Sequence, residues 1–261
     1  MCNNKTEFII DSEFEEQMKN SFYDNYYSEV TDYAIEYFAL ESIEKCKSIL
    51  KLCNGLKVSR VVDIGAGPCS ILLGLNKSNF APEYHVLEVS PSIVRFIREK
   101  ISIPRLKAVY LLDTTKTPFE NNFFDLGILS HVLEHLKNPS KLLSETLRIC
   151  KFVVLEVPLE DCLSQNIYSK FMQRLTGHKR GENPFGHINF FNKSSIRKLA
   201  TASGGVILKD RTYYPWRIFP GKSRMMTFLQ LFKSPIFYLT FKMSKSILVR
   251  THYAMLIKKI D

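Results

Sequence analysis

The sequence lacks the patterns of a secreted, zinc-knuckle or membrane-spanning protein. Its six cysteines include no Cys-x-x-Cys pair, which argues against a zinc knuckle or a disulfide framework and favours a reducing compartment. No apolar run approaches the ~20 residues that a membrane-spanning helix needs, and the first residues lack the apolar core of a signal peptide. These absences predict a cytoplasmic protein.

What is present is the composition of a folded chain with an uneven charge. The 261 residues are 45% hydrophobic and 12% aromatic, enough for one large core and a modest appended element. Residues 1–44 carry a net charge of −9, although the whole chain carries +10. Residues 215–250 combine seven basic side chains with many aromatic and aliphatic ones and contain no acid. That segment is typical of a helical lid with outward lysines, but it also suits an anionic membrane, a lipid-linked partner or nucleic acid.

Apolar runs alternate with helical patterns over residues 58–157, and this alternation predicts five strands of a parallel sheet with right-handed crossovers. The fifth strand, residues 152–157, is expected to stop at Pro158. Two more strands, 206–208 and 253–257, follow a helix at 193–203 that Asn192 caps. Their hairpin relation would make the last strand antiparallel.

The predicted fold is therefore α/β, a Rossmann-like, doubly wound, mostly parallel sheet of seven strands with an antiparallel last strand. We expect residues 1–57 to form an N-terminal helical cap and residues 58–261 to form the main domain. Within that domain, residues 215–250 would be an insertion or lid. The order of the strands should reverse between the first and the fourth, and a ligand crevice is expected at that point.

The turn after the first strand carries the most information. The strand ends near Asp63 and meets Gly65 and Gly67 before a helix, the unit that binds nucleotides at a strand's carboxyl end. Ser70 replaces the third glycine of a dinucleotide site, and Asp63 would repel a pyrophosphate but suits an ammonium group. Glu88 ends the second strand 21 residues after Gly67, the offset at which a carboxylate can accept both ribose hydroxyls.

Taken together, six segments of the chain resemble the class I S-adenosylmethionine-dependent methyltransferases, in particular the small-molecule branch that includes ubiquinone-pathway O-methyltransferases. The segments are Val62-Asp63-Ile64-Gly65-Ala66-Gly67, Leu87-Glu88-Val89-Ser90, Asp113 followed by Thr117-Pro118-Phe119, Phe124-Asp125-Leu126-Gly127, Ser130-His131-Val132-Leu133-Glu134-His135-Leu136 and Gly186-His187-Ile188-Asn189-Phe190-Phe191. The resemblance implies S-adenosylmethionine as cofactor. The residues implied to bind it are Asp63, Gly65, Gly67, Glu88, Asp113, Ser130 and His131. Cys69 stands where the family has a third glycine, and we expect it only to pack.

Acid–base candidates gather in two places. His131, Glu134 and His135 follow the fourth strand and are expected at the start of a helix, while His178 and His187 lie in the loop after the fifth strand. His135, His187 and His178 are the candidate bases for a hydroxyl acceptor. The other two histidines, His85 and His252, lie in strands and are expected to be structural.

The same residues could instead bind a metal ion or have a purely structural role. Ubiquinone-pathway and small-RNA terminal 2′-O-methyltransferases look similar in having Glu-x-x-Glu-His and a later His that bind a divalent ion. The matching positions here would be His131, Glu134, His135 and His187. His131 in place of the first Glu would favour a softer ion than Mg²⁺. Alternatively, no metal binds and Glu134 interacts with a helix dipole.

The leading interpretation is O-methylation of a small-molecule or carrier-linked hydroxyl, such as a sugar or quinone precursor. For residues 215–250, peripheral contact with a membrane is an alternative to the lid. A nucleic-acid methyltransferase is one alternative, although Ser130-His131-Val132-Leu133 replaces the Asn/Asp-Pro-Pro-aromatic tetrad of amino-methylating DNA enzymes. A non-catalytic scaffold of the same fold is another, and the intact Asp63 and Glu88 argue against it.

Overall fold

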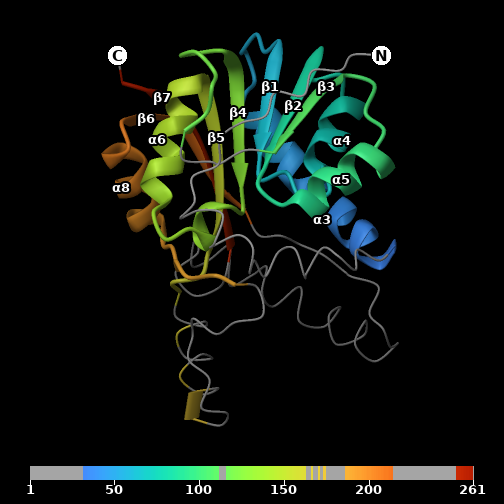
Figure 1. The fold of residues 1–261 in the computed structure, drawn as a ribbon. Coiled ribbons are helices and arrows are strands. Elements are labelled where there is room, and N and C mark those ends of the chain that lie inside the picture. The colour runs from blue at the N-terminus through green and yellow to red at the C-terminus, as the bar shows by residue number, and fades with distance from the viewer. Residues whose placement is uncertain are drawn as a thin grey trace.

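In the computed structural model, the described residues are 32–111, 116–162, 166, 170, 173–174, 186–213 and 251–260, with side chains described from residue 38 onward. They form one seven-stranded sheet with the order β3-β2-β1-β4-β5-β7-β6 (Figure 1). The strands are β1 Arg60–Ile64, β2 Glu83–Glu88, β3 Leu106–Leu111, β4 Phe124–Ser130, β5 Cys150–Leu159, β6 Gly205–Tyr213 and β7 Thr251–Lys259. The helices are α3 Asp32–Leu52, α4 Ser70–Lys77, α5 Pro91–Lys100, the short 3₁₀ helix η1 Leu133–His135, α6 Pro139–Ile149 and α8 Lys193–Ala202.

The sheet has the predicted mixture of strand directions. Strands β3, β2, β1, β4 and β5 pair in parallel, whereas β7 runs antiparallel to both β5 and β6. β1 lies between β2 and β4. Strands β2 and β3 therefore lie on one side of β1, and β4 and β5 lie on the other side. In a doubly wound sheet the ligand crevice opens at this point. The predicted fold class and the reversal between the first and fourth strands are confirmed.

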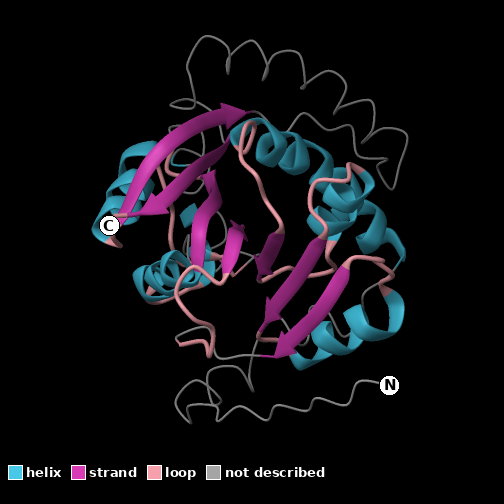
Figure 2. Ribbon diagram, turned by 90° about the horizontal axis from the view of Figure 1, so that it is seen from above, coloured by secondary structure: helices cyan, strands magenta, loops and turns pink. Residues whose placement is uncertain are grey.

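Helices cover both faces of the sheet (Figure 2). Ile49 of α3, Leu72 of α4 and Ile93 of α5 pack into one buried cluster with one face. Leu143 of α6 and Ile196 of α8 pack into a second cluster with the other face. This arrangement buries both faces of the central strands, which explains why their sequences read as continuous apolar runs.

The helix α8 was predicted correctly from the residues at its two ends. Asn192 caps it: its side chain accepts from Ser195 N–H at 2.9 Å, and Ser195 Oγ in turn lies 3.0 Å from Asn192 N, as an acceptor for that N–H. Gly204 follows the helix with a φ of +89°, a conformation that favours glycine.

The last three strands are longer than predicted: β6 covers Gly205–Tyr213 and β7 covers Thr251–Lys259, against the expected 206–208 and 253–257. The fifth strand does not stop before Pro158 but continues to Leu159. The pairing of β4 with β5 ends at Ser130 opposite Glu156. Beyond that point β7 is the one described strand that pairs with β5, and Leu159 adds a single bridge to Phe191. Pro158 therefore lies in a stretch with one neighbouring strand, where a residue without an N–H is tolerated.

Several predictions fall on residues that the structure does not describe. They concern residues 1–31 of the expected cap, Asp113, His178 and the expected insertion 215–250. The part of the predicted cap that is described is helical, as α3. Among the described helices, none combines the length and apolarity that crossing a bilayer would require.

Candidate functional site

The loop between β1 and α4 needs glycine for a steric reason. Gly65 has a φ of +71°, and a Cβ at this position would lie 2.8 Å from Cγ2 of Val132. Gly67 and Cys69 also have positive φ angles, +51° and +58°. Cys69 is fully buried, as its expected packing role requires. It holds the left-handed conformation at a cost of roughly 1–2 kcal/mol compared with glycine, so the loop keeps the shape that a third glycine would give it.

Glu88 joins the end of β2 to this loop. Its Oε2 accepts from the Gly67 N–H at 3.2 Å, and its Oε1 accepts from the Val89 N–H at 2.8 Å. The carboxylate is 7% exposed. The structure thus brings Gly67 and Glu88 into contact beside the carboxyl ends of β1 and β2, with Gly65 in the same loop.

Asp63 provides a buried negative charge beneath the loop. Burial, and secondly the charge of Glu88, raise the pKa of its carboxyl to about 7, while the charge of Lys45 acts in the opposite direction. Among the described residues, its Oδ2 has no hydrogen-bond partner. A cationic ligand in the crevice would favour the ionised form of Asp63, and the ammonium group of S-adenosylmethionine is such a cation.

Lys45, on α3, is a buried cation that the sequence did not single out. It is 7% exposed, and its Nζ lies 3.9 Å from Oε2 of Glu41. Its charge lowers the pKa of His131 and of the Glu156 carboxyl as well as that of Asp63. Lys45 therefore balances carboxylates on both sides of the switch point.

His131 lies in a strained turn directly after β4 and contacts acidic groups on both sides. Its φ is +58°, which is uncommon for a residue with a side chain. Its Nδ1 lies 3.4 Å from Oε1 of Glu134, and its Nε2 lies 3.4 Å from Oε1 of Glu156 and 3.4 Å from Nδ1 of His252. Burial, and then Lys45, lower the pKa of His131 to about 3, so the ring is neutral.

A second cluster contains Glu134, His135 and His187. Ligand atoms of the three lie within 4.8 Å of one another, and the rings of His135 and His187 are 4.7 Å apart in an edge-to-face arrangement. Nδ1 of His187 lies 2.6 Å from Oε2 of Glu160, and both side chains are buried. Burial raises the pKa of Glu134 to about 8 and lowers that of His135 to about 4.

The structure corrects the local context of these residues. His131, Glu134 and His135 are not at the start of an α-helix: Glu134 and His135 belong to the three-residue η1, and α6 begins later, at Pro139. The carboxylate of Glu134 is fully buried, and neither of its oxygens has a hydrogen-bond partner in the described part of the chain.

The four predicted metal ligands do not form one set. Glu134, His135 and His187 come together, whereas His131 groups with Glu156 and His252. Ser130 lies next to them at the end of β4, with its Oγ buried and without a partner among the described residues. His85 is in the middle of β2, bonded to Glu83, in keeping with a structural role.

The sequence did not indicate four residues of the site: Lys45, Glu156, Glu160 and Tyr213. It predicted a purely structural role for His252. Glu156 accepts from the Tyr213 hydroxyl at 2.7 Å and lies 3.1 Å from Nδ1 of His252. A carboxylate inside an otherwise apolar strand run was the one available signal, because a buried charge needs partners.

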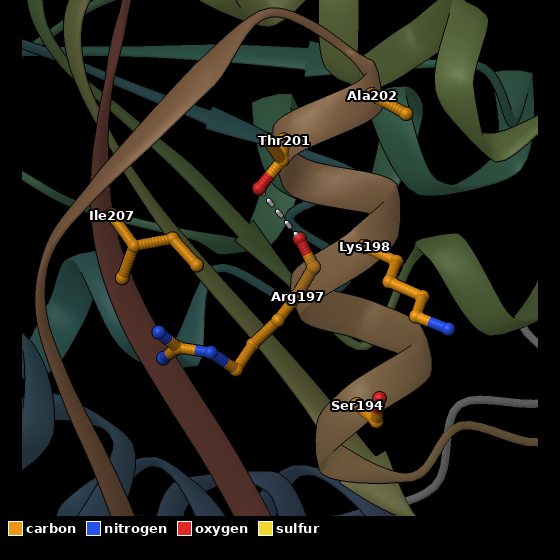
Figure 3. A pocket seen from close by; sticks show the side chains of 6 residues that line it. All are labelled: Ser194, Arg197, Lys198, Thr201, Ala202 and Ile207. Carbon is orange, nitrogen blue, oxygen red and sulfur yellow. Dashed lines mark hydrogen bonds between the residues drawn. The ribbon is translucent and has the colours of Figure 1, made fainter.

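The structure also has a surface hollow that lies away from the predicted site residues. It lies between α8 and β6 and is lined by Ser194, Arg197, Lys198, Thr201, Ala202 and Ile207 (Figure 3). Arg197 is already bonded to Asp210 and to the Tyr253 hydroxyl. None of the predicted site residues lines this hollow.

The strand order, the antiparallel β7, the glycine turn after β1 and the carboxylate at the end of β2 define a class I S-adenosylmethionine-dependent methyltransferase. Comparison of the sequence with models of protein families agrees, because residues 35–209 match the family model described as a methyltransferase domain. The chain belongs to this methyltransferase domain family. The residues present fit the cofactor, since a Cβ at Gly65 would clash with Val132 and the buried Oδ2 of Asp63 has no hydrogen-bond partner among the described residues.

Known relatives support the family and the fold. An uncharacterised methyltransferase of Schizosaccharomyces pombe is 31% identical over 137 residues, which are 48% of each chain, so the match spans about half the length of that relative. A chain of the complex between the Trm112 methyltransferase activator and a methyltransferase from Haloferax volcanii superposes with a TM-score of 0.63 at 14% identity, covering 93% of this chain and 99% of that one. A methyltransferase from Archaeoglobus fulgidus superposes at 0.55 with 17% identity, covering 94% and 98%.

Proposed function

We propose that this protein transfers the methyl group of S-adenosylmethionine to a hydroxyl of a small or carrier-linked molecule, such as a sugar or quinone precursor, in the cytoplasm. The observation that carries the proposal is the buried pair of His187 and Glu160 beside His135, close to the carboxyl ends of β4 and β5. A hydroxyl must lose a proton when it attacks the methyl carbon, and a positioned base supplies that step.

Glu160 prepares His187 to act as this base. A carboxylate 2.6 Å from Nδ1 favours the tautomer with its proton on Nδ1, which leaves the lone pair on Nε2. The same carboxylate would stabilise the imidazolium that forms when Nε2 takes the proton. His135 packs its ring against His187 and is the second candidate, and His178 remains a third from the sequence. The cofactor supplies an already activated methyl group, so the remaining work is positioning.

A divalent ion is a second way to lower the pKa of a hydroxyl acceptor. Glu134, His135 and His187 offer ligand atoms within 4.8 Å of one another, and the buried Glu134 oxygens have no hydrogen-bond partner among the described residues. An ion held there would bind the acceptor oxygen directly. The two versions differ in their sensitivity to chelators.

We further propose that residues 215–250 contact a lipid- or carrier-linked acceptor and, through it, a membrane surface. The strand residues that flank the segment lie at the site: Tyr213 bonds to Glu156, and His252 contacts His131. The segment is basic, aromatic and free of acids, so it complements an anionic headgroup or phosphate. Binding to nucleic acid in place of lipid vesicles would favour the alternative acceptor class.

The test is methyl transfer from radiolabelled S-adenosylmethionine to matched acceptors: free hydroxyl compounds, lipid-linked analogues and RNA. Product from the first two, with none from RNA, supports the proposal. Transfer only to amines or to RNA would overturn it. Calorimetry with S-adenosylhomocysteine tests the scaffold alternative, since a protein that gave no heat would lack the cofactor site.

A further inference from the structure

Three side chains from three neighbouring strands converge in a way that neither the methyl transfer nor the base requires. His131 follows β4, Glu156 lies in β5 and His252 lies in β7. The register of the sheet fixes their positions, because Ser130 is opposite Glu156 and Pro158 is opposite His252. Residues up to 121 positions apart in the sequence are thus held together by backbone pairing.

Their ligand atoms form a small triangle. Nε2 of His131 lies 3.4 Å from Oε1 of Glu156 and 3.4 Å from Nδ1 of His252, and that Nδ1 lies 3.1 Å from the same Oε1. Two nitrogens and an oxygen bound to one tetrahedral ion at about 2.0–2.1 Å lie about 3.3–3.4 Å from one another. The edges of the triangle are therefore close to those of three ligands on a single ion.

Hydrogen bonding alone leaves this triangle poorly explained. Oε1 of Glu156 has three close partners, including the Tyr213 hydroxyl at 2.7 Å, whereas Oε2 is buried with no hydrogen-bond partner in the described part of the chain. Glu156 is 1% exposed and His252 is 4% exposed. A buried carboxylate is costly unless its charge is compensated, and a cation bound at Oε1 would supply that compensation.

We propose that His131, Glu156 and His252 bind a divalent transition-metal ion of the zinc class. Two imidazoles and one carboxylate are ligands that Zn²⁺ prefers, and three protein ligands leave a fourth position open. Tyr213 holds one ligand from outside, through Oε1 of Glu156, and the carboxyl of Glu134 lies 3.4 Å from Nδ1 of His131. Water or an acceptor oxygen would fill the fourth position, and only the latter role rests on the proposed methyl transfer.

This site is separate from the cluster of Glu134, His135 and His187. The two sets share no ligand, although Nδ1 of His131 lies 3.4 Å from Oε1 of Glu134. That separation provides a matched control. His252→Gln and Glu156→Gln remove a ligand from the proposed site, whereas His187→Gln changes a buried histidine of the neighbouring cluster.

The experiment uses the full chain, stripped with a chelator and reloaded with Zn²⁺ or Co²⁺, and measures bound metal by equilibrium dialysis and elemental analysis. We expect the wild type to bind an equivalent that persists in His187→Gln. Affinity for that equivalent should fall by more than about tenfold in His252→Gln and Glu156→Gln, since even an outer partner of a metal site is worth roughly 10–100-fold. The proposal would be overturned if His252→Gln bound the metal with the affinity of the wild type, or if His187→Gln lost the bound metal.

A spectroscopic measurement on the wild type keeps the test independent of variant folding. Co²⁺ in a tetrahedral site absorbs visible light far more strongly than Co²⁺ in an octahedral oxygen site. Strong bands that Zn²⁺ displaces support the assignment. Failure of the stripped wild type to bind either metal would refute it, while leaving cofactor binding and methyl transfer open to their own assays.

Discussion

Nδ1 of His187 lies 2.6 Å from Oε2 of Glu160, and the pair is buried where the loop before α8 meets the end of β5. Glu160 follows the last residue of β5, so the carboxylate is positioned by the sheet and not by a loop alone. A buried carboxylate that holds one nitrogen of a histidine fixes the protonation of the other nitrogen. This relationship gives the candidate base a defined orientation, and it leads to the first prediction.

Replacing His187 with alanine should reduce turnover much more than cofactor binding. A positioned general base contributes roughly 10²–10⁴-fold to a rate, whereas the cofactor contacts come from Glu88 and the glycine loop. We expect kcat to fall by about 10²-fold or more while the dissociation constant of S-adenosylhomocysteine stays within about twofold. Glu160→Gln, which keeps a hydrogen-bonding side chain but removes the charge, should give a smaller fall in kcat. Unchanged turnover in His187→Ala would show that another group is the general base.

Replacing Glu88 with alanine tests the ribose assignment. A hydrogen bond to a charged group is worth roughly 1.5–3 kcal/mol, so the dissociation constant of S-adenosylhomocysteine should rise at least about tenfold by calorimetry. Glu120→Ala, at an exposed position outside the crevice, is the matched control and should bind as the wild type does. An equal constant for Glu88→Ala and wild type would defeat the assignment.

The sequence predicted the fold and the cofactor loop because their causes are local. Buried parallel strands read as apolar runs, and Gly65 is required by the turn in which it lies. The start of α6 also had a local signal, since Asn138 precedes Pro139 at the first helical position, but the histidines before it were wrongly joined to that helix.

The rest of the site could not be read from the sequence because its contacts are remote. Glu156 and His252 are 96 residues apart, and only the pairing of β5 with β7 brings them together. Glu156 lies between buried apolar residues and His252 is followed by a buried apolar run, so each resembled part of a core strand. The positive φ of His131 also has no signature in its neighbours.

Cofactor binding should release a proton below neutral pH. In the free protein burial and the charge of Glu88 raise the pKa of Asp63 to about 7, so below that pH the carboxyl is largely protonated. The cofactor's ammonium group favours the ionised form, and binding at pH 6 should release close to about one proton while binding at pH 8 should release about none. Calorimetry in buffers of different ionisation enthalpy measures this number. Release that persists in Asp63→Asn would assign the proton to another group, such as Glu134.

Chelation distinguishes the two ways of activating a hydroxyl. If a histidine alone acts as base, activity in excess chelator should equal that of the untreated enzyme. If an ion at Glu134, His135 and His187 binds the acceptor, activity should be lost with the chelator and restored by a divalent ion. His135→Ala would then lower both the bound metal and the turnover. A full rate in a protein shown by elemental analysis to be free of metal would exclude the metal version.

Replacing Gly65 with alanine should damage the cofactor loop by two separable effects. The new Cβ would lie 2.8 Å from Cγ2 of Val132, and a φ of +71° is unfavourable for alanine even without that contact. The backbone term alone is roughly 1–2 kcal/mol, so unfolding in urea should show a loss of at least that size together with weaker binding of S-adenosylhomocysteine. Adding Val132→Ala relieves the clash but not the strain, since it removes both Cγ atoms near position 65. The double variant should therefore recover part of the loss relative to Val132→Ala alone. Gly55→Ala has a φ of +91° and nothing within 4 Å, so it measures the strain without the clash. An equal loss of stability in Gly65→Ala and Gly55→Ala would show that contact with Val132 is not what requires glycine at position 65.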